Sequence, residues 1–234
     1  MSLDKIIELN SANFDRWDEQ LDEHYELQYN PGNFDSDESE SIFFQTNGLL
    51  MAIASNFFSF GKFKDQWDTS KCHINFMGQN LLLKSEKMNI TFDWGLDRNE
   101  FYMDAYIMYP ENIRYMTDDF WGLLLELKTL GTFEYTGSGY LSTEERLYFE
   151  NKTSTVFQMV RNFMLYQVEK MQGTNYQQPP SMDIGRFVLR WHAHTEWREL
   201  LEKTCKAFKL LYIINYQLWK ISDLARKKSE KRKE

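Results

Sequence analysis

The chain has 234 residues, of which 42% are hydrophobic and 16% aromatic, and its net charge at pH 7 is −8. This composition excludes the disordered class, because disordered chains lack the large apolar side chains whose burial offsets chain entropy. With only 11 glycines and 4 prolines available for flexible linkers, we expect a single globular α+β domain spanning residues 1–234.

Charge is unevenly distributed along the chain. Residues 1–40 carry twelve acidic side chains against two basic ones, a net charge of −10. The tail at residues 226–234 carries six basic and two acidic side chains, a net charge of +4. Strong binding to nucleic acid needs clustered cations that release counterions, so the overall acidity argues against it. We expect an acidic N-terminal helical segment (1–40) and a short, solvated basic tail.

Features of secreted and membrane proteins are weak in this sequence. Acidic residues interrupt the first ten positions, where a secretory leader needs an apolar run. The uncharged stretch 42–60 contains six polar side chains and a glycine, so no membrane span is expected there. Cys72 and Cys205 cannot form a disulfide framework, although the sequence does not exclude a single disulfide between them. These features indicate a cytoplasmic protein.

The N-terminal part is predicted to be mainly helical. Residues 3–28 place apolar side chains near helical spacing. Residues 30–40 are predicted to form a turn followed by a mobile acidic loop, because Pro31-Gly32 interrupts the pattern. Residues 48–67 fit a helix, and a hairpin turning at Asn47-Gly48 is the alternative, since this dipeptide favours positive φ.

The clearest pattern in the sequence is an alternation of apolar and polar residues. It extends over residues 88–94 and again over 101–109, as in two half-buried strands. Shorter alternations upstream extend the pattern to an antiparallel β meander over about residues 71–109, packed with several helices.

We expect the last two strands of the meander to form a hairpin. Trp94 is predicted to face Phe101, and Phe92 to face Met103. An even shift of register keeps the same side chains together on one face, whereas a shift of one residue would place Asp93 in the core.

The C-terminal half is predicted to be mainly helical. A helix over residues 117–128 is followed by a capping-box pattern at 142–145 and a second helix over 153–173. Residues 186–194 fit either a strand or a helix. A long amphipathic C-terminal helix is predicted over 196–226.

The predicted hairpin has a polar face with an unusual composition. Asp93, Tyr102, Asp104 and Tyr106 alternate with the apolar residues and therefore share this face. Two tyrosines are more aromatic surface than solvation requires, and tyrosine is favoured at interfaces. We expect these four residues to form a partner-binding surface.

A second chemical pattern consists of His192, His194 and Glu196. If residues 186–194 form a strand, the two imidazoles project from one face and can chelate a metal, with the carboxylate as a further ligand or base. If the segment is helical, the imidazoles diverge by about 200°. A metal-assisted hydrolase or nuclease is therefore the alternative function.

Common catalytic and nucleotide-binding motifs are absent from the sequence, including the phosphate-binding loop, the nucleophile elbow, HExxH and CxxC. We therefore expect no catalytic residue, no metal and no cofactor. The leading hypothesis is a non-catalytic protein that binds or regulates another protein. A basic partner fits the acidic charge, since opposite potentials steer association. A structural component of a phage or mobile element is a third hypothesis, and the oligomeric state is open.

Overall fold

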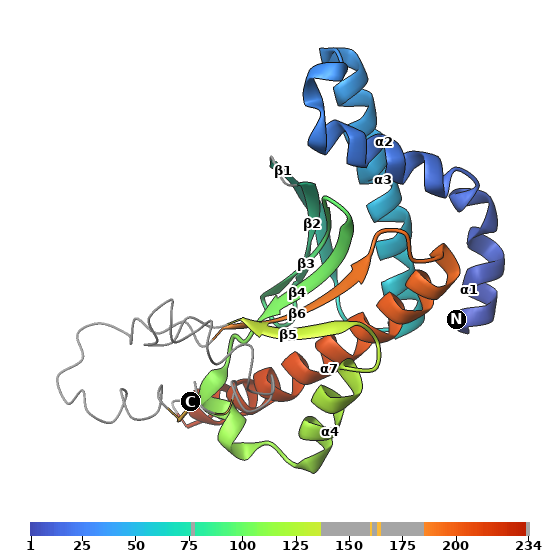
Figure 1. The fold of residues 1–234 in the computed structure, drawn as a ribbon. Coiled ribbons are helices and arrows are strands. Elements are labelled where there is room, and N and C mark those ends of the chain that lie inside the picture. The colour runs from blue at the N-terminus through green and yellow to red at the C-terminus, as the bar shows by residue number, and fades with distance from the viewer. Residues whose placement is uncertain (76–77, 137–159, 161–162, 165–184, 233–234) are drawn as a thin grey trace.

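The computed structural model describes residues 1–75, 78–136, 160, 163–164 and 185–232. At its centre is one six-stranded sheet, antiparallel throughout, with the spatial order β1–β2–β3–β4–β6–β5 (Figure 1). The strands are β1 (Trp67–Asn75), β2 (Gly78–Ser85), β3 (Ile90–Asp97), β4 (Glu100–Tyr106), β5 (Thr132–Thr136) and β6 (Arg186–His192). The predicted α+β class is confirmed, and the predicted meander corresponds to the first four strands.

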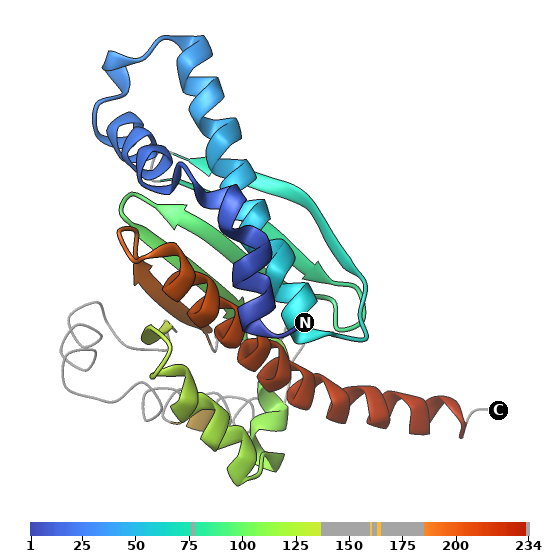
Figure 2. The same cartoon turned by 90° about the vertical axis from the view of Figure 1, so that its right-hand side faces the viewer.

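The helices gather on one side of the sheet. They are α1 (Leu3–Asn10), α2 (Trp17–Tyr29), α3 (Ser36–Gly61), α4 (Asp118–Leu127) and α7 (Trp197–Glu230), with 3-10 turns η1 (Ser11–Phe14), η2 (Pro31–Asn33) and η3 (Pro110–Tyr115). Figure 1 shows α1, α3 and α7 on the same side, and Figure 2 shows them in front of the sheet, with the C-terminal end of α7 projecting beyond it. Within the described residues, no helix lies over the opposite face.

Alternation along the strands places aromatic side chains beneath the helices. Phe92, Trp94 and Phe101 have no exposed surface. The Trp94 ring stacks on Phe101 with centroids 5.5 Å apart, and its indole N–H donates to the Leu50 carbonyl of α3 at 3.1 Å. Phe208 of α7 packs against Phe92 with ring centroids 5.1 Å apart. These contacts join α3, the sheet and α7 in one apolar core.

The β3–β4 hairpin has the predicted faces but a different register. Trp94 lies opposite Met103 rather than opposite Phe101, and Phe92 lies opposite Ala105 rather than opposite Met103. Both pairings shift by two residues, because the strands extend further toward a turn of only two residues. An even shift leaves each side chain on its expected face.

The N-terminal segment differs from the prediction in two places. The helix expected over residues 3–28 is divided into α1, η1 and α2. The prediction of an acidic loop over residues 30–40 is wrong, because α3 begins at Ser36 with Asp35 as its N-cap. Oδ1 of Asp35 accepts from the Glu38 N–H at 2.9 Å, and Oε2 of Glu38 accepts from the Asp35 N–H at 3.0 Å. Through this reciprocal capping box, the acidic residues stabilise the start of a helix.

The helix predicted over residues 48–67 exists, but it begins earlier and ends at Gly61. The alternative hairpin at Asn47-Gly48 is wrong. Gly48 lies on the exposed side of α3, where it costs about 1 kcal/mol relative to alanine. The next residues, Leu49 and Leu50, belong to the buried stripe of α3, whose burial offsets this cost.

Most C-terminal elements agree with the prediction. Residues 186–192 form a strand, which resolves the open alternative, and the helices predicted over 117–128 and 196–226 correspond to α4 and α7. The predicted capping box at 142–145 lies outside the described residues. So does the helix predicted over 153–173, apart from residues 160 and 163–164.

The stretch 42–60, considered above as a membrane span, lies within α3 and contributes to the core. Among the described residues, no helix combines the length and the apolar character that crossing a bilayer requires. Cys72 and Cys205 are both free thiols, the first exposed and the second buried.

The capping box predicts a specific effect on stability. Asp35→Ala removes the acceptor for the Glu38 N–H, so we expect the free energy of unfolding to fall by about 1 kcal/mol in urea denaturation followed by circular dichroism. Asp37→Ala is the control, because this exposed first-turn carboxylate makes only a dipole interaction of about 0.5 kcal/mol. An equal loss in both variants would contradict the capping role.

Candidate functional site

The four residues predicted to bind a partner share the sheet face opposite the helices. Asp93 of β3 is registered directly opposite Asp104 of β4, and Tyr102 and Tyr106 lie two positions before and after Asp104 on the same strand. The structure therefore brings the predicted residues together. Their exposure differs strongly, because Asp104 is only 4% exposed whereas Tyr106 is 44% exposed.

Two arginines of β6 complete this cluster, and sequence reasoning did not identify them as its members. Nη1 of Arg186 donates to Oδ2 of Asp104 at 2.9 Å. Nη1 of Arg190 donates to Glu100 at 3.4 Å, and its Nε lies 3.9 Å from the carboxylate of Glu134. Asp104, Glu100 and Glu134 thus have counterions within the sheet. Strand β6 supplies these arginines because it pairs with β4. Arg186 thereby reaches Asp104, although the two residues are 82 positions apart in the sequence.

The tyrosines pack against the sheet and its arginines. The Tyr102 ring lies over Gly95 of the neighbouring strand, where a Cβ would lie only 2.7 Å from the ring. The guanidinium of Arg190 lies 5.9 Å from the Tyr102 ring centroid, and that of Arg186 lies 5.5 Å from the Tyr106 centroid. Tyr102 is therefore a half-buried part of the face, and Tyr106 is its exposed aromatic group.

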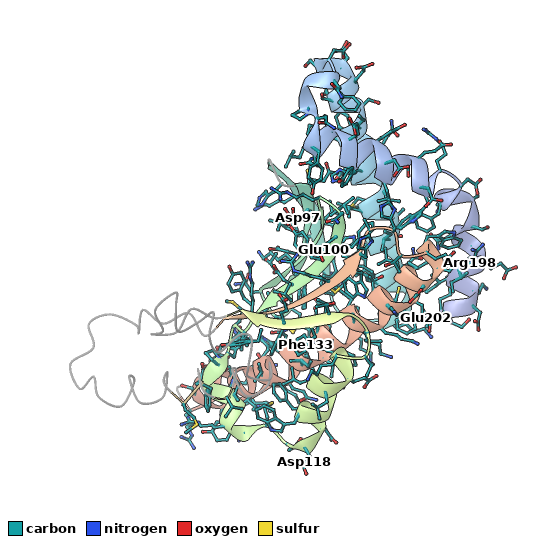
Figure 3. The ribbon with its side chains drawn as sticks, viewed as in Figure 1. Asp97, Glu100, Asp118, Phe133, Arg198 and Glu202 are labelled. Carbon is teal, nitrogen blue, oxygen red and sulfur yellow. The ribbon has the colours of Figure 1, made fainter. Side chains whose placement is uncertain are left out.

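The turn end of the β3–β4 hairpin adds further acidic groups to the same face. Asp97 and Glu100 lie opposite each other beside the turn. Figure 3 shows both on the hairpin, away from Arg198 and Glu202 on the helical side. Oδ1 of Asp97 is buried without a hydrogen-bond partner in the described part of the chain, and burial raises the pKa of this carboxyl group.

Burial gives the central carboxyl pair unusual protonation behaviour. Desolvation raises the pKa of Asp104 to about 7, and the nearby negative charge of Asp93 adds to the increase while Arg186 opposes it. Desolvation also raises the pKa of Asp93. Tyr102 has a raised pKa as well, through burial and then through the charges of both aspartates.

The two aspartates can hold one proton between them. Oδ1 of Asp104 has no N–H or O–H donor among the described residues, and the carboxyl group of Asp93 lies directly across the strand pair. Two carboxyl groups in contact cannot both ionise easily. The pair therefore binds or releases a proton near neutral pH, and this can link a binding event on the sheet face to pH.

The residues of the alternative metal site have other partners. Glu196 is the N-cap of α7, where its carboxylate accepts from the N–H groups of Arg198 and Glu199. The His194 N–H donates to Nδ1 of His192 at 3.2 Å, and the two rings lie 5.3 Å apart. In the ranges that the structure describes, no group of three His, Cys, Asp or Glu side chains could hold a metal ion.

A second candidate surface lies on α2, within the acidic N-terminal segment. Asp18, Asp22, Tyr25 and Tyr29 follow one another at three- or four-residue spacing, so they form one stripe along the helix. All four are exposed, and the rings of Tyr25 and Tyr29 lie 4.3 Å apart. We call this set the α2 stripe. Sequence reasoning identified the charge of this segment but not its tyrosines.

Comparison of this chain with protein-family models, curated proteins and solved structures finds no match.

The carboxyl pair predicts a pH-dependent stability. Asp104 holds its proton up to about pH 7 in the folded chain but only to its usual 3.8 when unfolded. The folded state therefore binds the proton more strongly, and this stabilisation is lost as the pH rises from about 4 to about 7. Asp104→Asn cannot lose a proton, so its stability relative to the parent should rise by about 1–3 kcal/mol between pH 5 and pH 8. Urea unfolding at each pH measures this difference.

Glu126→Gln is the matched control, because Glu126 is an exposed carboxylate on α4. We expect its stability to follow that of the parent at every pH. If Asp104→Asn also followed the parent across this range, the shared proton would be contradicted.

Proposed function

We propose that this chain is a non-catalytic protein-binding protein whose partner is a basic protein. The α2 stripe carries this proposal, because it combines exposed aromatic rings with carboxylates that lack cationic partners in the described structure. Aromatic side chains supply contact area, and uncompensated charge supplies attraction to a surface of opposite sign.

The aromatic part of the stripe is open to solvent. Tyr25 is 41% exposed and Tyr29 is 46% exposed. A neighbouring side of α2 faces the protein through the buried residues Trp17, Leu21, His24 and Leu27. Because this buried side holds the helix in place, the exposed tyrosines present a preformed surface and lose little conformational entropy on binding.

The charge of the segment is largely uncompensated. Residues 1–40 have a net charge of −10, and the ion pairs that the described residues show there join Arg16 to Glu19 at 2.7 Å and to Glu23 at 3.3 Å. The remaining carboxylates create a negative potential around α2. Such a potential accelerates encounter with a basic protein and weakens as salt is added.

We also predict that the sheet face with Asp93, Tyr102, Asp104 and Tyr106 is a second contact surface. Arg186 and Arg190 offset part of its negative charge, so attraction of a basic partner is weaker there than at the α2 stripe. Tyr106 is the group of this face that is most available to a partner.

Charge reversal on α2 tests the proposed function. The probe is a fluorescent eight-residue peptide of lysine and arginine around a central Leu-Phe pair, and its binding to the full chain is measured by fluorescence anisotropy. We expect binding that weakens as NaCl rises from about 0.05 M to about 0.15 M. Asp22→Lys should raise the dissociation constant about tenfold, because it reverses charge within the α2 stripe.

Glu126→Lys is the matched control, since it changes the net charge equally on the exposed surface of α4. We expect it to bind the peptide like the parent. Equal weakening by both variants would show that only net charge attracts the peptide, and no binding to the parent chain would overturn the proposed function.

A further inference from the structure

A cavity of about 550 Å³ lies between the start of α3 and the β1–β2 hairpin. These two segments lie side by side at one end of the molecule in Figure 1. The wall is mainly apolar and includes Phe34, Phe43, Phe44 and Ile74. Its volume falls within the range of about 300–1,000 Å³ that is typical of ligand pockets.

Apolar side chains of this cavity are unusually exposed. Phe44 of α3 is 68% exposed and Ile74 of β1 is 53% exposed, so both leave large apolar surfaces in water. Phe34 and Phe43 are half-buried beside them. A group of exposed apolar side chains around a hollow is typical of a binding site rather than of a solvated surface.

The rim of the cavity is acidic. Asp35 and Glu40 line it, and Asp37 and Glu38 lie between them in the first turn of α3. The positive end of the helix dipole is equivalent to roughly half a charge, which offsets only part of these four carboxylates. Glu40 has no ion-pair or hydrogen-bond partner within the described residues. The rim therefore favours a cation beside the apolar wall.

The floor holds a polar group that lacks a partner. Gln79 of β2 lines the cavity and is only 3% exposed. Its Nε2 donates to the Phe43 carbonyl at 3.1 Å, but its Oε1 is buried without a donor in the part of the chain that the structure describes. A buried acceptor without a donor is destabilising, so the wall beside Phe43 contains an unsatisfied polar group.

We propose that this cavity binds a peptide segment of the basic partner, in which a large apolar side chain lies next to a lysine or arginine. The apolar side chain packs against Phe43 and Phe44, and the cation lies at the carboxylate of Glu40. This inference rests on the proposed function and names the chemistry that the partner presents. A fatty acid fits the apolar wall, but its carboxylate meets the acidic rim.

Cys72 provides a direct measurement of occupancy. Its thiol is exposed and the residue lines the cavity, whereas Cys205 is buried in the core. Alkylation by iodoacetamide, followed by mass spectrometry of the intact chain, therefore reports on Cys72. The probe is the unlabelled form of the Lys/Arg peptide with its Leu-Phe pair. Two control peptides replace Leu-Phe by Ser-Ser or replace every cation by glutamate.

We expect the basic, apolar peptide at saturating concentration to slow alkylation of Cys72 about tenfold, and both control peptides to leave the rate unchanged. Phe44→Ser should abolish the protection by this peptide. Leu125→Ser is the matched variant, because Leu125 is an exposed apolar residue of α4 at 57% exposure. It should leave the protection intact.

Three results would overturn the inference. They are protection by the Ser-Ser peptide, protection that survives Phe44→Ser, and protection by dodecanoate but not by the basic peptide. If the peptide binds in the anisotropy experiment and Asp22→Lys weakens it while Cys72 stays unprotected, the cavity is not the site and the proposed function stands. If the peptide does not bind in either experiment, the proposed function itself fails.

Discussion

Phe208 of α7 lies where three parts of the fold meet, and its packing determines which face of the sheet is available for function. Its ring contacts Phe57 of α3 at 5.0 Å, Trp67 of β1 at 5.3 Å and Phe92 of β3 at 5.1 Å between centroids. Aromatic pairs of this kind contribute about 0.5–1.5 kcal/mol each beyond the area that they bury. Because Phe208 packs α7 and α3 against the same face of the sheet, the opposite face of β3, β4 and β6 stays uncovered by these helices. That face carries the hydrogen-bonded charged side chains.

The sheet face and the α2 stripe differ in how their negative charge is balanced. On the sheet face, Asp104 is buried and bonded to Arg186, so part of the charge is balanced within the sheet, and burial raises the pKa of Asp104. On α2, Asp18 and Asp22 stand in solvent, and their charge is available to another molecule. Location in the fold, rather than composition, therefore separates a carboxylate that maintains the structure from one that can attract a partner.

Local periodicity was sufficient to predict the faces of the sheet but not its long-range partners. The two-residue period placed Asp93 and Asp104 on one face, and the structure registers them opposite each other. The register itself differed because it depends on the length of the turn, where Arg98 adopts the left-handed conformation with φ of 51°. Arg186 joins the cluster through strand pairing across 82 residues, and no local pattern reports such a contact.

The acidic start of α3 was not predicted from the sequence for a different reason. Asp35 and Glu38 have capping-box spacing, but their charge and the preceding Pro-Gly favoured a loop in the prediction. The cavity beside them could not be predicted, because it forms only when this helix start meets β1 and β2. Exposed Phe44 and Ile74 are apolar in the sequence, and nothing in their neighbours indicates that they remain in water.

The edge position of β1 has a consequence for self-association. An edge strand offers unpaired backbone groups to other chains, and long flat edges promote aggregation. In β1 the register shifts between Asp68 and Lys71, as at a β-bulge, and both residues place charge beside the irregular segment. The part of β1 that keeps a continuous register is the short segment 71–75. The charged, irregular part of β1 therefore disfavours edge-to-edge pairing with a second copy at this side of the sheet.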